Sequence, residues 1–186
     1  MIPSREQAWA LLTEHTRSPN LLKHALGVEA AMRAYARQSG ADEELWGVVG
    51  LVHDLDYEGH PSLEEHPFVG AEIMRTQGYS EEIVNAVLGH ADHTGVARET
   101  QMAKALYAVD ELVGFVVAVA LVRPAKSITE LPVKSVLKKF KDKAFCRAID
   151  RDHLRAGAAD LGVEMRDHVE TVTAALAGIA DDLELA

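Results

Sequence analysis

The chain has 186 residues, of which 48% are hydrophobic, 26% charged and 5% aromatic, as in ordinary soluble globular proteins rather than fibrous, disordered or membrane chains. Its 19 Lys and Arg residues against 29 Asp and Glu give a net charge of −10, which opposes general binding to nucleic-acid polymers. The single Cys146 excludes an internal disulfide framework. Because Met1 begins no signal-like leader and no apolar run approaches the ~20 residues of a membrane span, we expect a cytoplasmic protein with no membrane partner.

Helix start and stop signals follow one another along the chain. Ser4 with Gln7 three residues later forms a capping box for a short first helix. Pro19 then stands at a first helical position and opens a helix that ends at Ser39 and Gly40. These signals predict two consecutive helices before residue 41.

The same reasoning predicts helices throughout the rest of the chain. We expect them from Asp42 to His53-Asp54-Leu55-Asp56, from Pro67 to Gln77, from Ser80 to about His90, from Thr100 toward Val122, from Pro132 through Phe140, then one that closes at Gly162 and one from about Met165 to Leu183. The Val-rich stretch 113–122 has strand propensity, but it continues a helical pattern and has no partner strand. The prediction is therefore an all-α chain of eight or nine helices that forms a single domain over residues 1–186.

Nine histidines in an acidic chain need an explanation, because histidine is the commonest metal ligand. His24 lies in the middle of a predicted helix on the side of Leu21 and Val28. The doublet His53-Asp54 directly follows the apolar run Val-Val-Gly-Leu-Val, where burying two polar groups is costly unless they find partners. A metal ion is one such partner.

The order of these residues resembles a known family. His24, the doublet His53-Asp54 and Asp110 follow the H…HD…D order of the HD-domain superfamily of metal-dependent phosphohydrolases. The resemblance covers roughly residues 20–122 and implies a single HD domain with that core. The remainder, residues 123–186, is then a basic helical C-terminal extension.

Two more features are similar to the HDIG subgroup of that superfamily. The segment His66-Pro67-Phe68-Val69-Gly70-Ala71-Glu72-Ile73-Met74 resembles its HPxxGAxIL-type segment. His90 ends the next predicted helix, where the subgroup has another histidine.

The resemblance implies a centre with two divalent metal ions. One ion would be held by His24, His53 and Asp110, the other by His66 and His90, with Asp54 bridging both. A set of imidazoles and carboxylates suits Fe, Mn, Zn, Ni or Co better than Ca. A hydroxide between the two ions would then attack phosphorus, so the implied activity is hydrolysis of a small phosphate ester, such as a nucleotide, with Asp54 in a catalytic role.

The sequence also departs from its relatives. Many HD proteins carry Gly-Lys soon after the doublet, whereas this chain has Asp56, Tyr57 and Glu58, which are candidates to shape the pocket instead. His90 is followed by Ala91 and not by the His-His pair and Gly-Tyr-Pro loop of the HD-GYP cyclic-dinucleotide phosphodiesterases. That activity is therefore not carried over.

His93 has two interpretations. If the helix continues past His90, His93 lies on a similar face and is a candidate extra ligand or catalytic proton donor; otherwise it is a polar loop residue. The four other histidines have no partner spacing and are predicted to be surface residues: His15, His60, His153 and His168.

Charge is distributed unevenly along the chain. Residues 123–151 contain nine Lys and Arg against three Asp and Glu, a net of +6, so the remainder of the chain carries −16. Arg123 and Lys126, which follow the Asp110 helix, are candidate substrate-binding residues for a small phosphorylated ligand. The alternative is a solvated helix face whose lysines pair with acidic helices elsewhere.

Three functional hypotheses remain open. The first is the dinuclear-metal phosphohydrolase, acting on a monoester or a diester. The second is a diiron oxygenase with the same four-His, two-Asp ligand set, although the close spacing of His90 and Asp110 favours hydrolysis. The third is a non-catalytic HD module that binds a nucleotide or a protein partner. The sequence leaves the substrate, the metal and the oligomeric state undetermined.

Overall fold

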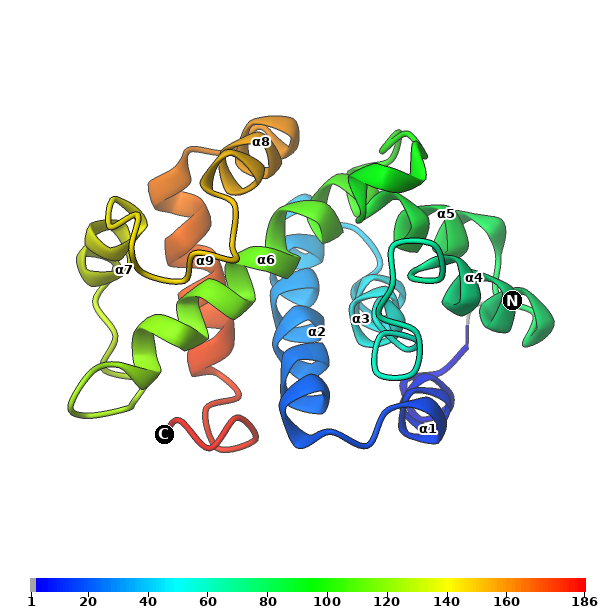
Figure 1. The fold of residues 1–186 in the computed structure, drawn as a ribbon, viewed down its shortest axis with the longest axis horizontal. Helices are drawn as coiled ribbons and strands as arrows, with labels where there is room; N and C mark the ends of the chain where they lie inside the picture. The colour runs from blue at the N-terminus through cyan, green and yellow to red at the C-terminus, as the bar shows by residue number, and fades with distance from the viewer. Residues whose placement is uncertain (1–2) are drawn as a thin grey trace.

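The structure, a computed structural model, describes residues 3–186, and within this range the chain forms nine α-helices, one short 3₁₀ helix and no strand (Figure 1). The helices are α1 (Arg5–His15), α2 (Pro19–Ser39), α3 (Glu43–Val52), α4 (Phe68–Thr76), α5 (Glu81–Gly89), η1 (Asp92–Thr94), α6 (Gln101–Leu121), α7 (Val133–Phe140), α8 (Arg151–Leu161) and α9 (Met165–Ala177). The all-α prediction is confirmed. The Val-rich stretch belongs to α6 and is helical, as expected.

Side-chain caps fix the helix starts near the N-terminus. The Ser4 hydroxyl accepts the N–H of Gln7 while the Gln7 side chain accepts the N–H of Ser4, which completes the predicted capping box. Asp42 accepts the N–H of Leu45 at 3.0 Å and starts α3. Ser18, in contrast, makes no side-chain cap, so the start of α2 depends on the proline at its first turn.

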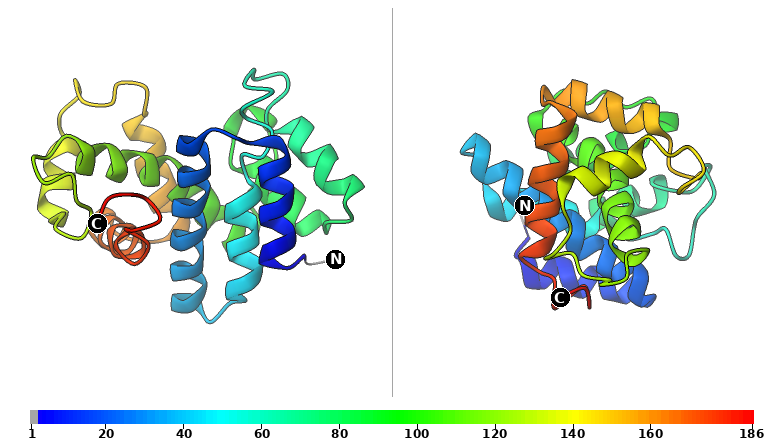
Figure 2. Two further views of the ribbon diagram at one scale, coloured as in Figure 1. Left: turned by 90° about the horizontal axis from the view of Figure 1, so that it is seen from below. Right: turned by 90° about the vertical axis from the view of Figure 1, so that its left-hand side faces the viewer.

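The two longest helices, α2 and α6, pack against each other at the centre of the molecule (Figures 1 and 2). On one side, α3 packs on α2 and α1 packs on α3, while α5 contacts both α6 and α4. On the other side, α8 and α9 pack on α6, and α9 also reaches α2. Because α6 is covered from both sides, it is apolar over most of its circumference, with Leu112, Phe115 and Val116 fully buried.

The crossing of α8 and α6 depends on a glycine. A Cβ atom added to Gly157 would lie 2.8 Å from the Cα of Ala108, which is a backbone atom that has little room to move. The absence of a side chain at Gly157 thus lets α8 approach α6 two residues before Asp110.

Gly157→Ala is expected to destabilise the fold by roughly 1–3 kcal/mol, because the overpacking cost at this contact exceeds the gain of up to ~1 kcal/mol in helix propensity. Gly114→Ala is the matched control, since Gly114 is also helical and has no atom within 4 Å of an added Cβ. Midpoints of urea denaturation of both variants test this. Equal or higher stability of Gly157→Ala would contradict the close approach.

The last helix is shorter than predicted. It ends at Ala177 and not near Leu183, and the chain after Gly178 continues in turns. These turns bring Leu183 and Leu185 onto the core, where both are buried, and the Leu185 carbonyl accepts the N–H of Ile128 at 2.7 Å. Tertiary packing of these leucines therefore overrides the helical pattern after Gly178.

His168 is fully buried, which corrects its predicted place on the surface. Its Nε2–H donates to the carbonyl of Ala108 at 2.9 Å, and its Nδ1 accepts the hydroxyl of Tyr35 at 2.6 Å. A carbonyl oxygen only accepts, so this ring is the neutral tautomer with hydrogen on Nε2. Burial lowers the pKa of His168. Local spacing could not predict this burial, because Tyr35, which hydrogen-bonds to the ring, is 133 positions away in the sequence.

The lowered pKa of His168 predicts a loss of stability in mild acid. Between its folded pKa and the unfolded value near 6.5, the unfolded chain binds more protons, so stability falls as the pH drops below about 6.5, by up to ~1.4 kcal/mol per pH unit. Urea midpoints at pH 7.5 and 5.5 should differ more for the wild-type protein than for His168→Gln, which keeps a donor for Ala108. If the change in urea midpoint between the two pH values were the same for both proteins, burial of a neutral His168 would not be the cause of the acid sensitivity.

Within residues 3–186, none of the helices combines the length and the apolar character that crossing a membrane requires.

Candidate metal centre

The doublet that follows α3 is held in a buried turn. His53 is 0% exposed at its side chain, and its Nδ1–H donates to the carbonyl of Gly50 at 2.8 Å. Its Nε2 is buried and has no hydrogen-bond partner. The next residue, Asp54, is 18% exposed at its side chain and is surrounded by imidazoles. A buried imidazole nitrogen without a partner is costly unless another group satisfies it.

The two carboxylate oxygens of Asp54 face two different sets of histidines. Oδ2 lies 3.5 Å from Nε2 of His53 and 3.9 Å from Nε2 of His24. Oδ1 lies 3.5 Å from Nε2 of His66 and 3.5 Å from Nε2 of His90. Asp54 therefore stands between two pairs of imidazole nitrogens.

Asp110 completes the first set from the middle of α6. Its Oδ1 lies 2.9 Å from Nε2 of His24 on α2 and 3.4 Å from Nε2 of His53. The packing of α2 on α6 thus brings together two residues that are 86 positions apart in sequence. Candidate ligand atoms lie within 4.8 Å of one another in each of two groups: His24, His53, Asp54 and Asp110, and Asp54, His66 and His90.

The buried histidines are oriented by acceptors on their far sides. Nδ1–H of His90 donates to the carbonyl of Val87, as His53 does to its own helix. Nδ1 of His66 lies 2.8 Å from Oδ1 of Asp56. Because carbonyl and carboxylate oxygens only accept, each ring carries a hydrogen on Nδ1, which leaves Nε2 as the atom that faces Asp54 and that can bind a metal ion in place of a proton.

Asp56 is a functional candidate that the sequence indicated only among three candidates to shape the pocket. It is buried, and its second oxygen accepts the N–H of Gly70 at 2.7 Å. A Cβ on Gly70 would lie 3.0 Å from the Asp56 carboxyl carbon, so the glycine of the His-Pro-x-x-Gly segment allows this carboxylate to approach the backbone. The hydrogen bond thereby ties His66 to the start of α4.

The electrostatics of the cluster favour positive charge. Burial opposes ionisation of Asp54 and Asp110, but the neighbouring histidines outweigh it and hold the pKa of both carboxyls below the usual range. Burial also lowers the pKa of His90, yet its hydrogen bond with Asp54 and the charges of both aspartates raise that pKa to about 9. The pKa of His53 is raised by the same carboxylates against the effect of burial. In the absence of metal, protons supply the positive charge that the two aspartates attract.

A cavity of about 370 Å³ opens onto this cluster. It is lined by Leu21, His24, Asp54, Tyr57, His66, His90, Ala91, Asp110, Glu111, Gly114, Ile149 and His153. Burial and the charge of Asp110 raise the pKa of Glu111.

His153 lies in the wall of this cavity, although its sequence context predicted a surface residue. Its ring packs on Tyr107 with the centroids 4.1 Å apart, and its Nε2 is buried without a hydrogen-bond partner. It comes from α8, so the C-terminal extension contributes to the cavity. Neither motif nor periodicity links His153 to residues 20–122, and only the crossing of α8 on α6 places it there.

His93 is turned away from the cluster. The helix α5 ends at Gly89, and the extended backbone of Ala91 separates it from the 3₁₀ turn that carries His93. Nε2–H of His93 donates to the carbonyl of His66 at 2.9 Å, and its exposed side chain is not among the cavity residues. The helix continuation that would place His93 beside His90 does not occur.

Arg123 and Lys126 are not brought to the cluster either. They follow the C-terminal end of α6, and Arg123 lies roughly 20 Å from Asp110 at the helical rise of 1.5 Å per residue. Arg123 donates to the hydroxyl of Ser135 at 3.1 Å and to the carbonyl of Glu130 at 3.4 Å, which stabilises the turn before α7. Lys126 is exposed in that turn with a φ of 48°. Their substrate-binding role stays a prediction that this geometry does not favour.

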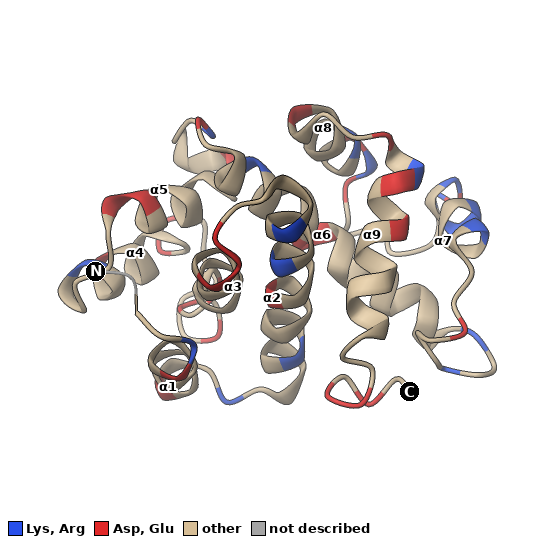
Figure 3. Cartoon of the chain, turned by 180° about the vertical axis from the view of Figure 1, so that it is seen from behind, with Lys and Arg blue, Asp and Glu red and all other residues tan. Residues whose placement is uncertain are grey.

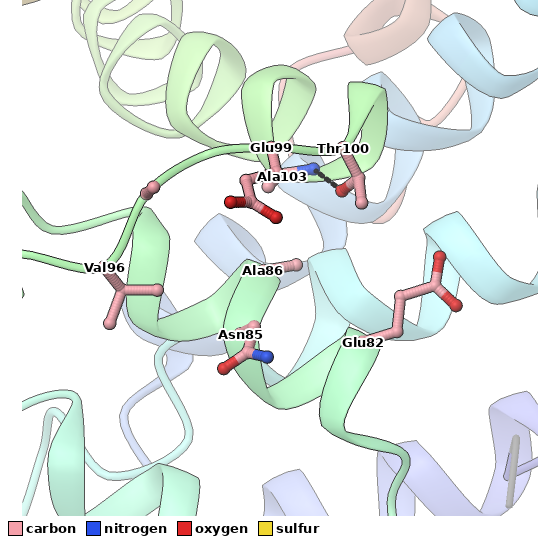
Figure 4. A pocket seen from close by; sticks show the side chains of 8 residues that line it. Glu82, Asn85, Ala86, Val96, Glu99, Thr100 and Ala103 are labelled. Atoms are coloured by element: carbon pink, nitrogen blue, oxygen red, sulfur yellow. Dashed lines mark hydrogen bonds between the residues drawn. The ribbon is translucent and has the colours of Figure 1, made fainter.

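Another cavity, of about 410 Å³, lies between α5 and the start of α6 (Figure 4). Its polar lining includes Glu82, Asn85 and Glu99, and it contains no histidine. The Thr100 hydroxyl in its wall accepts the N–H of Ala103 and caps α6. This cavity therefore contains none of the candidate metal ligands found among the described residues.

Comparison with known proteins gives a family and a group of relatives. The HD domain family model matches residues 21–114. Ribonuclease Y of Oleidesulfovibrio alaskensis is 30% identical over 98 residues, 52% of this chain and 18% of that protein. Ribonuclease Y of Rhodopirellula baltica is 34% identical over 76 residues, which are 40% of this chain and 15% of that protein. Ribonuclease Y of Thermosipho melanesiensis is 37% identical over 75 residues, which are 38% of this chain and 14% of that protein. The chain thus spans less than a fifth of the length of these curated relatives. No solved structure matches it.

Proposed function

The chain belongs to the HD-domain family, and from that premise we propose that it is a metal-dependent hydrolase of phosphate esters whose active site is the cluster around Asp54. The observation that carries the proposal is the position of Asp54, with one oxygen toward His24 and His53 and the other toward His66 and His90. A carboxylate between two groups of imidazoles is suited to bridging two cations.

The residues present fit such cations. The buried Nε2 of His53 has no hydrogen-bond partner, and His66 and His90 use Nδ1 for hydrogen bonds on their far sides, so the Nε2 atoms of all three rings are available as metal ligands. We propose His24, His53, Asp54 and Asp110 for one divalent ion, and Asp54, His66 and His90 for the other. The donors suit Fe, Mn, Zn, Ni or Co. When bound, the ions supply an activated water and neutralise charge on the phosphoryl oxygens.

The chain's own residues position the substrate and the ligands. Asp56 and the carbonyls of Gly50 and Val87 orient the rings, so little reorganisation is needed when substrate enters. Tyr57 and His153 offer polar atoms in the wall of the cavity. Their side chains are proposed to hold the substrate beside Asp54.

The substrate class is also a proposal. A small phosphate ester such as a nucleotide fits a cavity of about 370 Å³. A second candidate is a phosphodiester of RNA, which the similarity to proteins named ribonuclease Y favours. The exclusion of nucleic-acid polymers that net charge predicted therefore has no support from the relatives and is withdrawn.

We propose that residues 1–186 form a single domain with its core in residues 20–122. The C-terminal extension, residues 123–186, supplies Ile149 and His153 to the cavity over Asp54. The cytoplasmic location stays a prediction.

Purified protein loaded separately with Mn, Fe, Zn, Ni or Co tests the activity. We would assay it on p-nitrophenyl phosphate, bis-p-nitrophenyl phosphate, nucleoside monophosphates, cyclic nucleotides and a five-nucleotide oligoribonucleotide. We expect hydrolysis of at least one of them. Turnover of the oligoribonucleotide would favour RNA as the substrate, whereas turnover of the small esters alone would favour a small phosphate ester. Oxygen consumption by the iron-loaded protein without hydrolysis would favour the oxygenase alternative. Metal binding without turnover of any kind would favour the non-catalytic module.

A further inference from the structure

A basic cavity of about 540 Å³ lies on the C-terminal extension. Its lining contains the cations Lys141, Lys143, Arg147, Arg151 and Arg155 and the carboxylates of Asp150 and Asp152. Five cationic side chains thus face two carboxylates, in a chain whose net charge is −10. The cavity belongs to the basic part of the sequence, and Lys and Arg also gather on the neighbouring α7 (Figure 3).

Two of the five cations already have partners within the chain. The guanidinium of Arg151 donates to the carbonyls of Cys146 at 3.0 Å and Ile149 at 2.6 Å and lies over the ring of Phe115, 4.6 Å from its centroid. Arg155 pairs with Asp152 at 2.5 Å and is therefore partly neutralised. Arg151 thus fixes the loop between α7 and α8 against the core, which gives the cavity a defined wall.

The other three cations are exposed and uncommitted. Lys141, Lys143 and Arg147 make no side-chain hydrogen bond or ion pair with any residue that the structure describes. The acidic neighbour Asp142 is already engaged by Lys139 at 3.2 Å and by the N–H of Ala144. Three free donors of like charge on one cavity match the oxygens of a phosphate group.

This basic cavity adjoins the cavity over Asp54. Ile149 lines both of them, and α8, which begins two residues later, sends His153 into one and Arg155 into the other. A molecule that has a phosphate group beside Asp54 can therefore extend past Ile149 toward the free cations.

We infer that the basic cavity is a second phosphate-binding site, which takes another phosphate group of the substrate cleaved at Asp54. This inference rests on the proposed function and narrows it to substrates with at least two phosphate groups, either a nucleotide with a second phosphate or an oligonucleotide. The net charge of −16 on the chain outside residues 123–151 repels such polyanions. The free cations therefore also determine which face of the protein the polyanions approach.

The test compares two triple variants that lose the same charge. Lys141→Gln/Lys143→Gln/Arg147→Gln removes the free cations, and Lys134→Gln/Lys138→Gln/Arg166→Gln removes three exposed cations that do not line the cavity. Dissociation constants of metal-free protein are measured for adenosine 3′,5′-bisphosphate, adenosine 5′-monophosphate and a fluorescein-labelled five-nucleotide oligoribonucleotide. KM values of metal-loaded protein follow for those that are hydrolysed.

We expect the cavity variant to bind the bisphosphate or the oligoribonucleotide about tenfold more weakly than the control variant, with the monophosphate unchanged. A loss for both probes identifies any second phosphate as the ligand, whereas a loss for the oligoribonucleotide alone, with a shallower salt dependence, identifies nucleic acid. Equal affinities of the two variants for both probes would overturn the inference. A binding difference together with no hydrolysis of any of these probes or of the phosphate esters assayed above would overturn the proposed function and leave the phosphate site standing.

Discussion

Replacing Asp54 with alanine is expected to abolish phosphate-ester hydrolysis and to lower the metal content of the purified protein. Both carboxylate oxygens are lost at once, and each faces a different pair of histidines. Residues that only orient a metal ligand are typically worth ~10–100-fold in affinity or activity, so removal of a bridging ligand should cost more than about 100-fold.

Metal analysis and single-substrate kinetics on the same preparation measure this effect. Asp54→Asn keeps one oxygen and the shape of the side chain, so we expect it to retain more metal than the alanine variant. Asp181→Ala removes an exposed carboxylate near the C-terminus and serves as the control for net charge. If Asp54→Ala matched Asp181→Ala in metal content and turnover, both the centre and the proposed function would be wrong.

Much of the fold and of the candidate site was predictable because the signals are local. Caps such as Ser4 and Asp42 depend on residues within one helical turn, and the structure shows their hydrogen bonds. The six candidate ligands lie on successive helices or in the turns next to them, in an order that resembles the family. The packing of α2 on α6 then brings His24 and Asp110 to 2.9 Å, as that order implies.

What the sequence concealed depends on contacts between distant segments. His168 becomes a buried residue through Tyr35, 133 positions away, and His153 reaches the cavity only because Gly157 lets α8 approach α6. The expected roles of Arg123 and Lys126 assumed that the residues after α6 stay near Asp110. The length of α6 instead places them at the far end of the helix.

Asp56→Asn is expected to weaken binding of the metal proposed for His66 and His90 by ~10–100-fold and to lower turnover in proportion, without loss of the fold. The aspartate accepts from both His66 and the N–H of Gly70. An asparagine has one oxygen, and if that oxygen remains with Gly70, its NH₂ group faces Nδ1 of His66. The ring must then carry its hydrogen on Nε2, which removes the lone pair that faces Asp54.

The chain offers a matched control for this exchange. Glu65 lies 2.9 Å from Nδ1 of His60 in the same kind of carboxylate-imidazole pair, but both side chains are exposed and neither lines the cavity over Asp54. Glu65→Gln should leave metal affinity and turnover unchanged, while Asp56→Asn reduces both and retains a helical circular-dichroism spectrum. Because tautomer control is the proposed cause, the nitrogen chemical shifts of His66 should move in Asp56→Asn alone. Equal metal affinity in the two variants would show that Asp56 only stabilises the loop before α4.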